Sequence, residues 1–262
     1  MKLTIFFLSI FMFCFSCKEK NAETNPTPKE DSTVTEMVYP ENLSKVFDAH
    51  GGLGLWKQMQ TLKFTMPEDD GDETTTVDLK SRKSLIDMPN HVLGYNGKDV
   101  WLLNKDTTSY KGNPKFYNNL MFYFFAMPFV MADKGIKYEE AQPLTLDGMT
   151  YPGIKISFES GIGESPNDEY LLYYDQDYKL TWLSYTVTYF SKEKSAEFHF
   201  MKYSNWQNVE GLLFPETMEW HKTENNLPTA LGKEFKFVDV EISKQKMDPE
   251  LFEKPEGAEI MK

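Results

Sequence analysis

Residues 113–132 have the sequence NPKFYNNLMFYFFAMPFVMA, which is apolar on almost every face of a helix. Asparagine is a good helix N-cap and proline is favoured at the first helical position, so Asn113 and Pro114 predict where this helix begins. Pro128 should kink or end it, because proline lacks the backbone N–H that a helix needs. The apolar stretch is too short to span a bilayer. We therefore expect the helix to be enclosed by protein or to cover an apolar surface.

The chain before this segment predicts two short helices and then a strand. Residues 41–59 have apolar side chains at helical spacing, interrupted by Gly51-Gly52. The side chains expected to be buried are Leu43, Val46, Phe47, Leu53, Trp56 and Met59. From Thr61 the apolar period changes to two, which indicates a half-buried strand.

Apolar runs separated by turn residues predict antiparallel hairpins along the rest of the chain. In residues 92–103, Asn96-Gly97 predicts a two-residue type I′ turn. Residues 170–190 and 197–221 form two further predicted hairpins, which turn at 175–177 and 208–211. The last predicted strand, residues 234–243, changes its apolar face after Phe237, which indicates a bulge or burial on both sides.

Four segments carry a resemblance to a known family. They are Ala49-His50-Gly51-Gly52 followed by Trp56, the hairpin of residues 95–101, Tyr173-Tyr174-Asp175 before a second strand, and Val240-Glu241-Ile242 leading to residues 247–252. At these segments the chain resembles the LolA, LolB and LppX group of lipoprotein-carrier and lipid-binding proteins. The resemblance implies an α+β fold: a curved antiparallel sheet forming a half-barrel, with N-terminal helices and an apolar helical lid or plug. It also implies an apolar cavity that accepts acyl chains.

The apolar helix is the candidate ligand site. Aromatic and methionine side chains are large and apolar, and methionine is deformable, which suits a site for variable hydrocarbon. The candidate ligand-binding residues are Phe116, Tyr117, Leu120, Met121, Phe124, Phe125 and Phe129. An ordinary core helix needs the same residue types, so that interpretation stays open.

The N-terminus predicts a bacterial lipoprotein. Residues 1–16 combine one cation, Lys2, with an apolar core too short to span a bilayer, which is typical of a cleavable signal. In Cys14-Phe15-Ser16-Cys17 a cysteine directly follows a small residue, although Cys14 and Phe15 depart from the usual motif. We expect Cys17 to carry a lipid, palmitate among its acyl groups, that anchors the protein to a membrane.

The residues after Cys17 predict a tether and one domain. Residues 17–36 contain few aliphatic side chains and are expected to be a flexible tether. Residues 37–262 contain no repeat, and we expect a single domain there. Because Lys18-Glu19-Lys20 follows the anchor without a strong acidic run, the expected location is the periplasmic face of the outer membrane, with the cell surface as the alternative.

Composition and motifs argue against several classes of function. With 40 acidic and 28 basic residues the net charge is −12, which argues against nucleic-acid binding. The sequence contains no Gly-x-Ser-x-Gly, glycine-rich phosphate loop or His-Glu-x-x-His motif, so we expect no catalytic residue and no cofactor. His199 and His221 could meet on neighbouring strands, but no third metal ligand is evident, and no metal is expected. The acidic residues 68–73 are interpreted as a solvated turn, not a calcium loop.

The sequence leaves two hypotheses about function. The first is a membrane-anchored protein that binds a lipid or lipidated ligand in an apolar cavity. The second is an interaction or structural module with a filled core, whose partner is another envelope protein. An enzyme ranks below both, because no nucleophile and base or metal set is evident.

Overall fold

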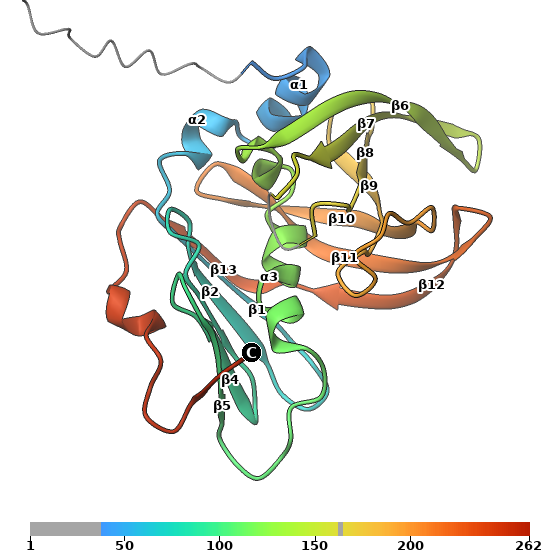
Figure 1. The fold of residues 1–262 in the computed structure, drawn as a ribbon. Helices are drawn as coiled ribbons and strands as arrows, with labels where there is room; N and C mark the ends of the chain where they lie inside the picture. The colour runs from blue at the N-terminus through green and yellow to red at the C-terminus, as the bar shows by residue number, and fades with distance from the viewer. Residues whose placement is uncertain (1–37, 162–164) are drawn as a thin grey trace, which may run out of the picture. The chain divides into compact units, whose positions relative to one another are not determined.

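The computed structural model describes residues 38–161 and 165–262 (Figure 1). Within these ranges, Tyr39–Lys262 forms one compact unit. The predicted signal, Cys17 and the tether lie outside the described residues, so the division at residues 16 and 36 stays a prediction. In the described ranges, no helix is both long enough and apolar enough to cross a membrane.

The first sheet, sheet A, contains seven antiparallel strands in the order β13-β1-β2-β3-β4-β5-β14. Their bounds are β1 (Thr61–Met66), β2 (Glu73–Asp78), β3 (Ser84–Asp87), β4 (His91–Tyr95), β5 (Val100–Asn104), β13 (Val238–Ser243) and β14 (Glu259–Ile260). The strand predicted from Thr61 onward is confirmed as β1. Its Leu62, Phe64 and Met66 are buried.

The second sheet, sheet B, also contains seven antiparallel strands, in the order β12-β11-β10-β9-β8-β7-β6. Their bounds are β6 (Ile136–Leu146), β7 (Met149–Phe158), β8 (Tyr170–Tyr174), β9 (Leu180–Tyr185), β10 (His199–Val209), β11 (Leu212–Glu224) and β12 (Leu227–Lys236). The hairpin predicted at 197–221 is confirmed, with Glu210 and Gly211 forming its turn at positive φ. The hairpin predicted at 170–190 is shorter than expected, because β9 ends at Tyr185.

Helix α3 (Pro114–Phe125) lies between the two sheets (Figure 1). The ring of Phe125 packs 4.3 Å from that of Phe64 on β1 and 5.2 Å from that of Phe214 on β11. On the sheet B side, the Tyr203 hydroxyl donates to the Phe124 carbonyl at 2.9 Å. The predicted helix is thus enclosed by protein on two sides. It is followed by a short 3-10 helix, η1 (Phe129–Ala132).

The strands divide into two sheets, where the resemblance implied one curved sheet. Helix α3 separates β5 from β6, and Phe237 alone separates β12 in sheet B from β13 in sheet A. The Phe237 side chain is buried and its N–H donates to the Glu216 carbonyl at 2.9 Å. The change of apolar face after Phe237 therefore coincides with the passage from one sheet to the other. A bulge, as predicted, follows in β13, where the pairing with β1 shifts between Lys63↔Glu241 and Thr65↔Val238. The α+β class and the antiparallel pairing are confirmed.

The two predicted N-terminal helices are confirmed as α1 (Glu41–Ala49) and α2 (Leu53–Trp56). Between them, the buried imidazole of His50 joins α1 to sheet B. Its Nδ1–H donates to the Val46 carbonyl at 2.7 Å, and its Nε2 accepts from the Leu180 N–H at 3.4 Å. The second contact requires the neutral ring, because Nε2 can accept only when it carries no proton. Burial lowers the pKa of His50 from 6.5 to about 4, and the hydrogen bond to Val46 opposes this only in part.

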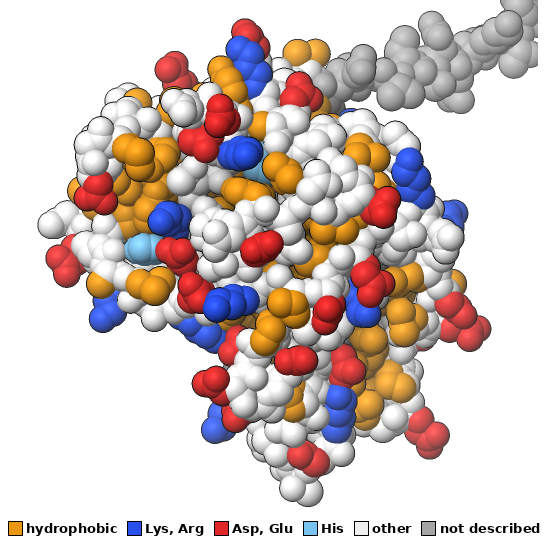
Figure 2. Space-filling model, turned by 180° about the vertical axis from the view of Figure 1, so that it is seen from behind, with side chains coloured by type: hydrophobic (Ala, Val, Ile, Leu, Met, Phe, Trp, Pro, Cys, Tyr) orange, Lys and Arg blue, Asp and Glu red, His pale blue; other side chains and the backbone are white. Residues whose placement is uncertain are grey.

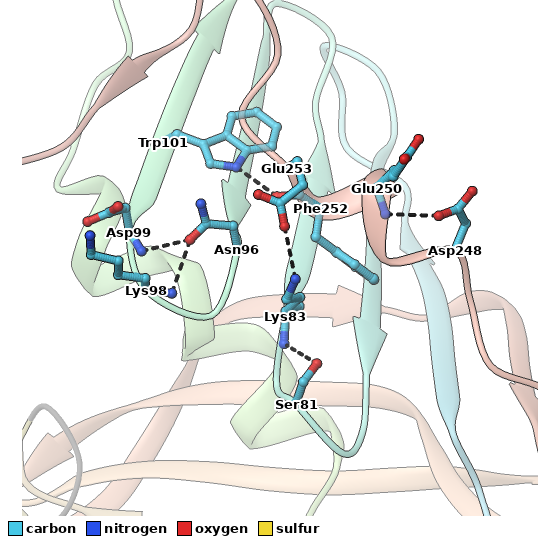
Figure 3. Close-up of polar contacts among 10 residues, drawn as sticks. All are labelled: Ser81, Lys83, Asn96, Lys98, Asp99, Trp101, Asp248, Glu250, Phe252 and Glu253. Atoms are coloured by element: carbon cyan, nitrogen blue, oxygen red, sulfur yellow. Dashed lines mark hydrogen bonds and ion pairs between the residues drawn. The ribbon is translucent and has the colours of Figure 1, made fainter.

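The β4–β5 hairpin differs from its prediction. Tyr95 pairs with Val100, so the turn contains four residues and not the two of a type I′ turn. The Asn96 Oδ1 accepts from the N–H groups of Lys98 (3.0 Å) and Asp99 (2.8 Å), as Figure 3 shows. In this register Trp101 lies opposite Gly94, and its indole N–H donates to the Phe252 carbonyl at 3.0 Å. A two-residue turn would shift this pairing by two residues.

Substituting Gly94 by alanine tests this packing. A Cβ at Gly94 would lie 2.1 Å from the Trp101 ring, and overpacking of this kind costs about 1–3 kcal/mol. Gly54→Ala is the matched control, because a Cβ at that exposed helical position meets no atom within 4 Å. We expect chemical denaturation to show a loss for Gly94→Ala and no loss for Gly54→Ala. Equal stability of the two variants would contradict the observed register.

Candidate ligand-binding site

Helix α3 begins and ends where the sequence predicted. The Asn113 Oδ1 accepts from the Phe116 N–H at 3.1 Å, and Pro114 occupies the first helical position. The helix ends at Phe125, three residues before Pro128. These local signals set the length of α3, and the two sheets then determine which of its faces meets protein.

A cavity of about 240 Å³ lies between α3 and the β6–β8 part of sheet B. Its apolar walls combine one face of α3 with side chains from sheet B and the loop after β9. They are Phe116, Leu120, Tyr123, Phe124, Ile136, Phe158, Tyr170 and Tyr189. The rings of Tyr123 and Tyr170 lie 6.0 Å apart, and that of Phe158 lies 5.8 Å from Tyr170. Most of these side chains are only half-buried, so together they form an apolar wall that is open to solvent.

Two carboxylates among the residues that line the cavity already have partners. Asp168 accepts from the Thr188 N–H at 2.6 Å and from its hydroxyl at 2.7 Å. Asp133 accepts from the Arg82 guanidinium at 2.6 and 2.7 Å. Burial raises the pKa of both carboxyls, and these partners oppose the rise. Their oxygens therefore serve the fold.

Two phenol groups also line the cavity. Burial raises the pKa of Tyr123 and that of Tyr170, so both hydroxyls stay protonated at neutral pH. Within residues 38–161 and 165–262, neither hydroxyl makes a hydrogen bond. Each is thus free to donate to a polar atom of a ligand.

The seven predicted ligand-binding residues fall into two groups. Phe116, Leu120 and Phe124 line the cavity. The other four contact protein instead: Tyr117, Met121, Phe125 and Phe129. Of these, Met121 is 3% exposed and Phe125 and Phe129 are fully buried. The ring of Phe129 stacks on Trp56 at 4.9 Å.

One feature of the sequence distinguishes the cavity face of α3 from its core face. Lys115 and Asn119 are one turn apart and lie on the cavity side of α3, where they mark the face that meets solvent. Phe116, Leu120 and Tyr123 follow at helical spacing on that side. The residues from sheet B had no comparable signal, because Phe158 alternates with polar neighbours as in any half-buried strand and Tyr170 begins a continuous apolar run.

A polar site, separate from the apolar cavity, lies on the opposite side of α3. The Tyr117 hydroxyl donates to both oxygens of Glu73, at 2.8 and 3.0 Å. Burial raises the pKa of Glu73 to about 7, and the hydrogen bond from Tyr117 only partly offsets this. The interpretation of residues 68–73 as a solvated turn is thus wrong for Glu73, which begins β2 and is 8% exposed. Glu73 lies on the same strand face as the buried Thr75 and Val77, and therefore points inward.

The histidines do not assemble a metal site among the described residues. Phe200 pairs with His221, so His199 and His221 lie on opposite faces of sheet B. His199 contacts Tyr185 at 5.5 Å, whereas His221 contacts Trp182 at 4.8 Å. The expectation that the two imidazoles could meet is wrong, because an offset of one residue reverses the face of a strand.

Comparison with solved structures identifies the fold. The chain is similar to a LolA superfamily protein from Nitrosomonas europaea, with 9% sequence identity and a TM-score of 0.50 over 83% of this chain and 99% of that one. It is also similar to a DUF1329 family protein from Desulfovibrio piger, with 11% identity and a TM-score of 0.48 over 82% and 98%. No family model matches the sequence. No curated protein matches it either. The fold is therefore LolA-like, as the resemblance implied.

Proposed function

We propose that this LolA-like protein binds the hydrocarbon chain of a lipid or lipidated ligand, without covalent chemistry, in the cavity between α3 and sheet B. The observation that carries the proposal is the cavity of about 240 Å³ with its open aromatic and aliphatic wall. Ligand pockets for drug-sized molecules are about 300–1,000 Å³, so this cavity suits part of one chain. Helix α3 then acts as a plug between the sheets, with one face left for the ligand.

Burial of hydrocarbon supplies the binding energy in this proposal. Each methylene removed from water contributes about 0.8 kcal/mol, so a few methylenes give measurable affinity. Phe116, Leu120 and Phe124 are the ligand-binding residues that α3 contributes. The other four predicted residues contact protein and hold the helix in place: Tyr117, Met121, Phe125 and Phe129. No catalytic residue takes part.

The proposal includes the membrane anchor predicted from the sequence. A lipid on Cys17 and a tether at residues 17–36 hold residues 37–262, the single domain, close to a membrane. We place the protein on the periplasmic face of the outer membrane, with the cell surface as the alternative. There the cavity has access to lipids and to other envelope lipoproteins.

A charge placed in the cavity tests the proposal. We expect Leu120→Asp to weaken binding of cis-parinaric acid, a fluorescent fatty acid, by at least about tenfold, because a carboxylate in an apolar site costs free energy. Leu251→Asp is the control, since Leu251 is 45% exposed and does not line the cavity. Circular dichroism establishes that both variants fold. Equal affinity of the two folded variants would refute this placement of the site.

Lipid extraction from the purified protein tests the function itself. A Cys17→Ser protein is purified without detergent, and its organic extract is analysed by mass spectrometry. Lipid present at a defined stoichiometry supports the proposal. An empty, folded protein that also fails to bind cis-parinaric acid would favour the interaction module.

A further inference from the structure

A second hollow, of about 440 Å³, lies beside the N-terminal half of α3. It is bounded by the β2–β3 turn, the β4–β5 turn and Met261 near the C-terminus. Figure 3 shows Ser81 and Lys98, which belong to these two turns and line the hollow. Unlike the first cavity, this one has mainly polar walls.

Its charged side chains are mostly cationic. Arg82, Lys98 and Lys115 line it, and Asp99 is the one acidic residue among its described lining residues. Arg82 is paired with Asp133. In the described part of the chain, no carboxylate lies within ion-pair distance of Lys98 or Lys115. Figure 2 shows one face of the molecule, on which acidic and basic side chains are interspersed. The whole chain has a net charge of −12, so the two lysines give this hollow a local positive charge that the chain as a whole does not have.

A buried amide also borders the hollow. Asn118 is 5% exposed, and its Oδ1 accepts from the Ser84 hydroxyl at 2.9 Å. Its Nδ2 donates to no atom of the described residues. Among the described residues, the enclosed side-chain polar atoms without a partner are Thr75 Oγ1 and Ser184 Oγ, so the Asn118 Nδ2 is accessible to solvent. It can therefore donate to an anionic oxygen in the hollow.

The two cavities share part of one helix. Lys115 and Asn119 line both, and they are one turn apart on the exposed side of α3. The apolar cavity and the cationic hollow therefore open on either side of the same turn. A molecule with a hydrocarbon tail in one can place its polar end in the other by crossing this turn.

We infer that the ligand is an amphiphile with an anionic, phosphate-type headgroup, held in the second hollow by Lys98, Lys115 and the Asn118 amide while its tail occupies the first cavity. This rests on the proposed function and adds the chemical class of the ligand. Lysine ammonium groups and a neutral amide donate to phosphate oxygens, and hydrogen bonds to charged groups are the stronger ones. Asp133 and Asp168 do not line the second hollow, and Asp133 is paired with Arg82.

The test compares two probes that share one acyl chain, lysophosphatidylglycerol and lysophosphatidylcholine. Both are used below their micellar concentration with the full chain carrying Cys17→Ser. We expect the protein to prefer the anionic lipid by about tenfold, a difference of about 1.4 kcal/mol. Adding Lys98→Gln and Lys115→Gln should abolish that preference, because it should lower the affinity for lysophosphatidylglycerol much more than the affinity for lysophosphatidylcholine. The control pair Lys137→Gln and Lys222→Gln removes the same charge from β6 and β11, outside both cavities, and should keep the preference.

Each other outcome has a defined meaning. Equal affinity for the two lipids, or a preference that survives Lys98→Gln with Lys115→Gln, would overturn the inference and leave the proposed function standing. Inorganic phosphate that binds as tightly as lysophosphatidylglycerol would show a site for free anions, unconnected to the tail cavity, and would also overturn it. Folded protein that binds neither lipid would refute the proposed function.

Discussion

Phe125→Ala is expected to lower the free energy of unfolding by about 3–5 kcal/mol, the usual cost of deleting a buried phenylalanine ring. The Phe125 side chain is fully buried. Its ring lies 4.3 Å from Phe64 in sheet A, 5.2 Å from Phe214 in sheet B and 4.6 Å from Phe237 at the crossing between the sheets. The void would therefore lie where both sheets meet α3, and neither sheet can close it alone. Urea denaturation measures the loss.

Phe116→Ala is the matched substitution on the other face of the same helix. Phe116 is half-buried, and its ring contacts Tyr189 at 5.0 Å and Phe190 at 5.1 Å at the surface. We expect it to cost about 1 kcal/mol or less, and to weaken binding of cis-parinaric acid where Phe125→Ala, if folded, does not. A large loss of stability at Phe116, or a small one at Phe125, would contradict the division of α3 into a cavity face and a core face.

The second large effect concerns stability, to which two buried groups contribute with opposite dependences on pH. His50 has a pKa of about 4 in the folded protein and 6.5 as its ordinary value. Its neutral form stabilises the fold above pH 6.5, and that stability is lost as the pH falls toward 4. Glu73 has a pKa raised from 4.5 to about 7. Its contribution is fully present below pH 4.5 and is lost as the pH rises through 7.

The two contributions nearly cancel over the same pH range. Between about pH 7.5 and about pH 5, each changes the free energy of unfolding by about 2 kcal/mol, with opposite sign. Glu73→Gln removes one of them, so relative to the unmodified protein the variant should lose about 2 kcal/mol on acidification. His50→Gln should gain about 2 kcal/mol over the same interval.

Urea denaturation at the two pH values measures both differences. Tyr117→Phe is a useful third variant, because it removes the hydrogen bond that lowers the pKa of Glu73 and should shift the Glu73 transition to higher pH. Parallel pH dependences for Glu73→Gln and His50→Gln would contradict the burial of at least one of these groups. Direct titration of the His50 imidazole by NMR would identify which.

Local chemistry in the sequence predicted the secondary structure well. The capping of α3 by Asn113 and its end before Pro128 depend on neighbours within a few residues, and so does the break at Gly51-Gly52 between α1 and α2. The β4–β5 turn was an exception. Asn96-Gly97 favours a two-residue turn locally, but the four-residue turn places Trp101 opposite Gly94, where its ring has room.

The candidate site was predicted only in part. Phe116, Leu120 and Phe124 line the cavity, while Phe125 and Phe129, of the same residue type, lie in the core. The type of an apolar residue does not indicate whether its side chain will contact protein or an open cavity. That outcome depends on which strand reaches the helix, and Tyr170 and Phe158 are distant in sequence.

By itself the sequence determined where α3 begins, that two short helices separated by Gly51-Gly52 precede the first strand, that antiparallel hairpins follow, and the LolA-like resemblance. These properties follow from periodicity, capping and turn chemistry, which act over a few residues. Only the tertiary structure decided that the strands form two sheets, that Glu73 and His50 are buried, and that one face of α3 meets a cavity close to Lys98 and Lys115. Burial and cavity formation depend on segments that are far apart in the chain, and no local pattern contains that information.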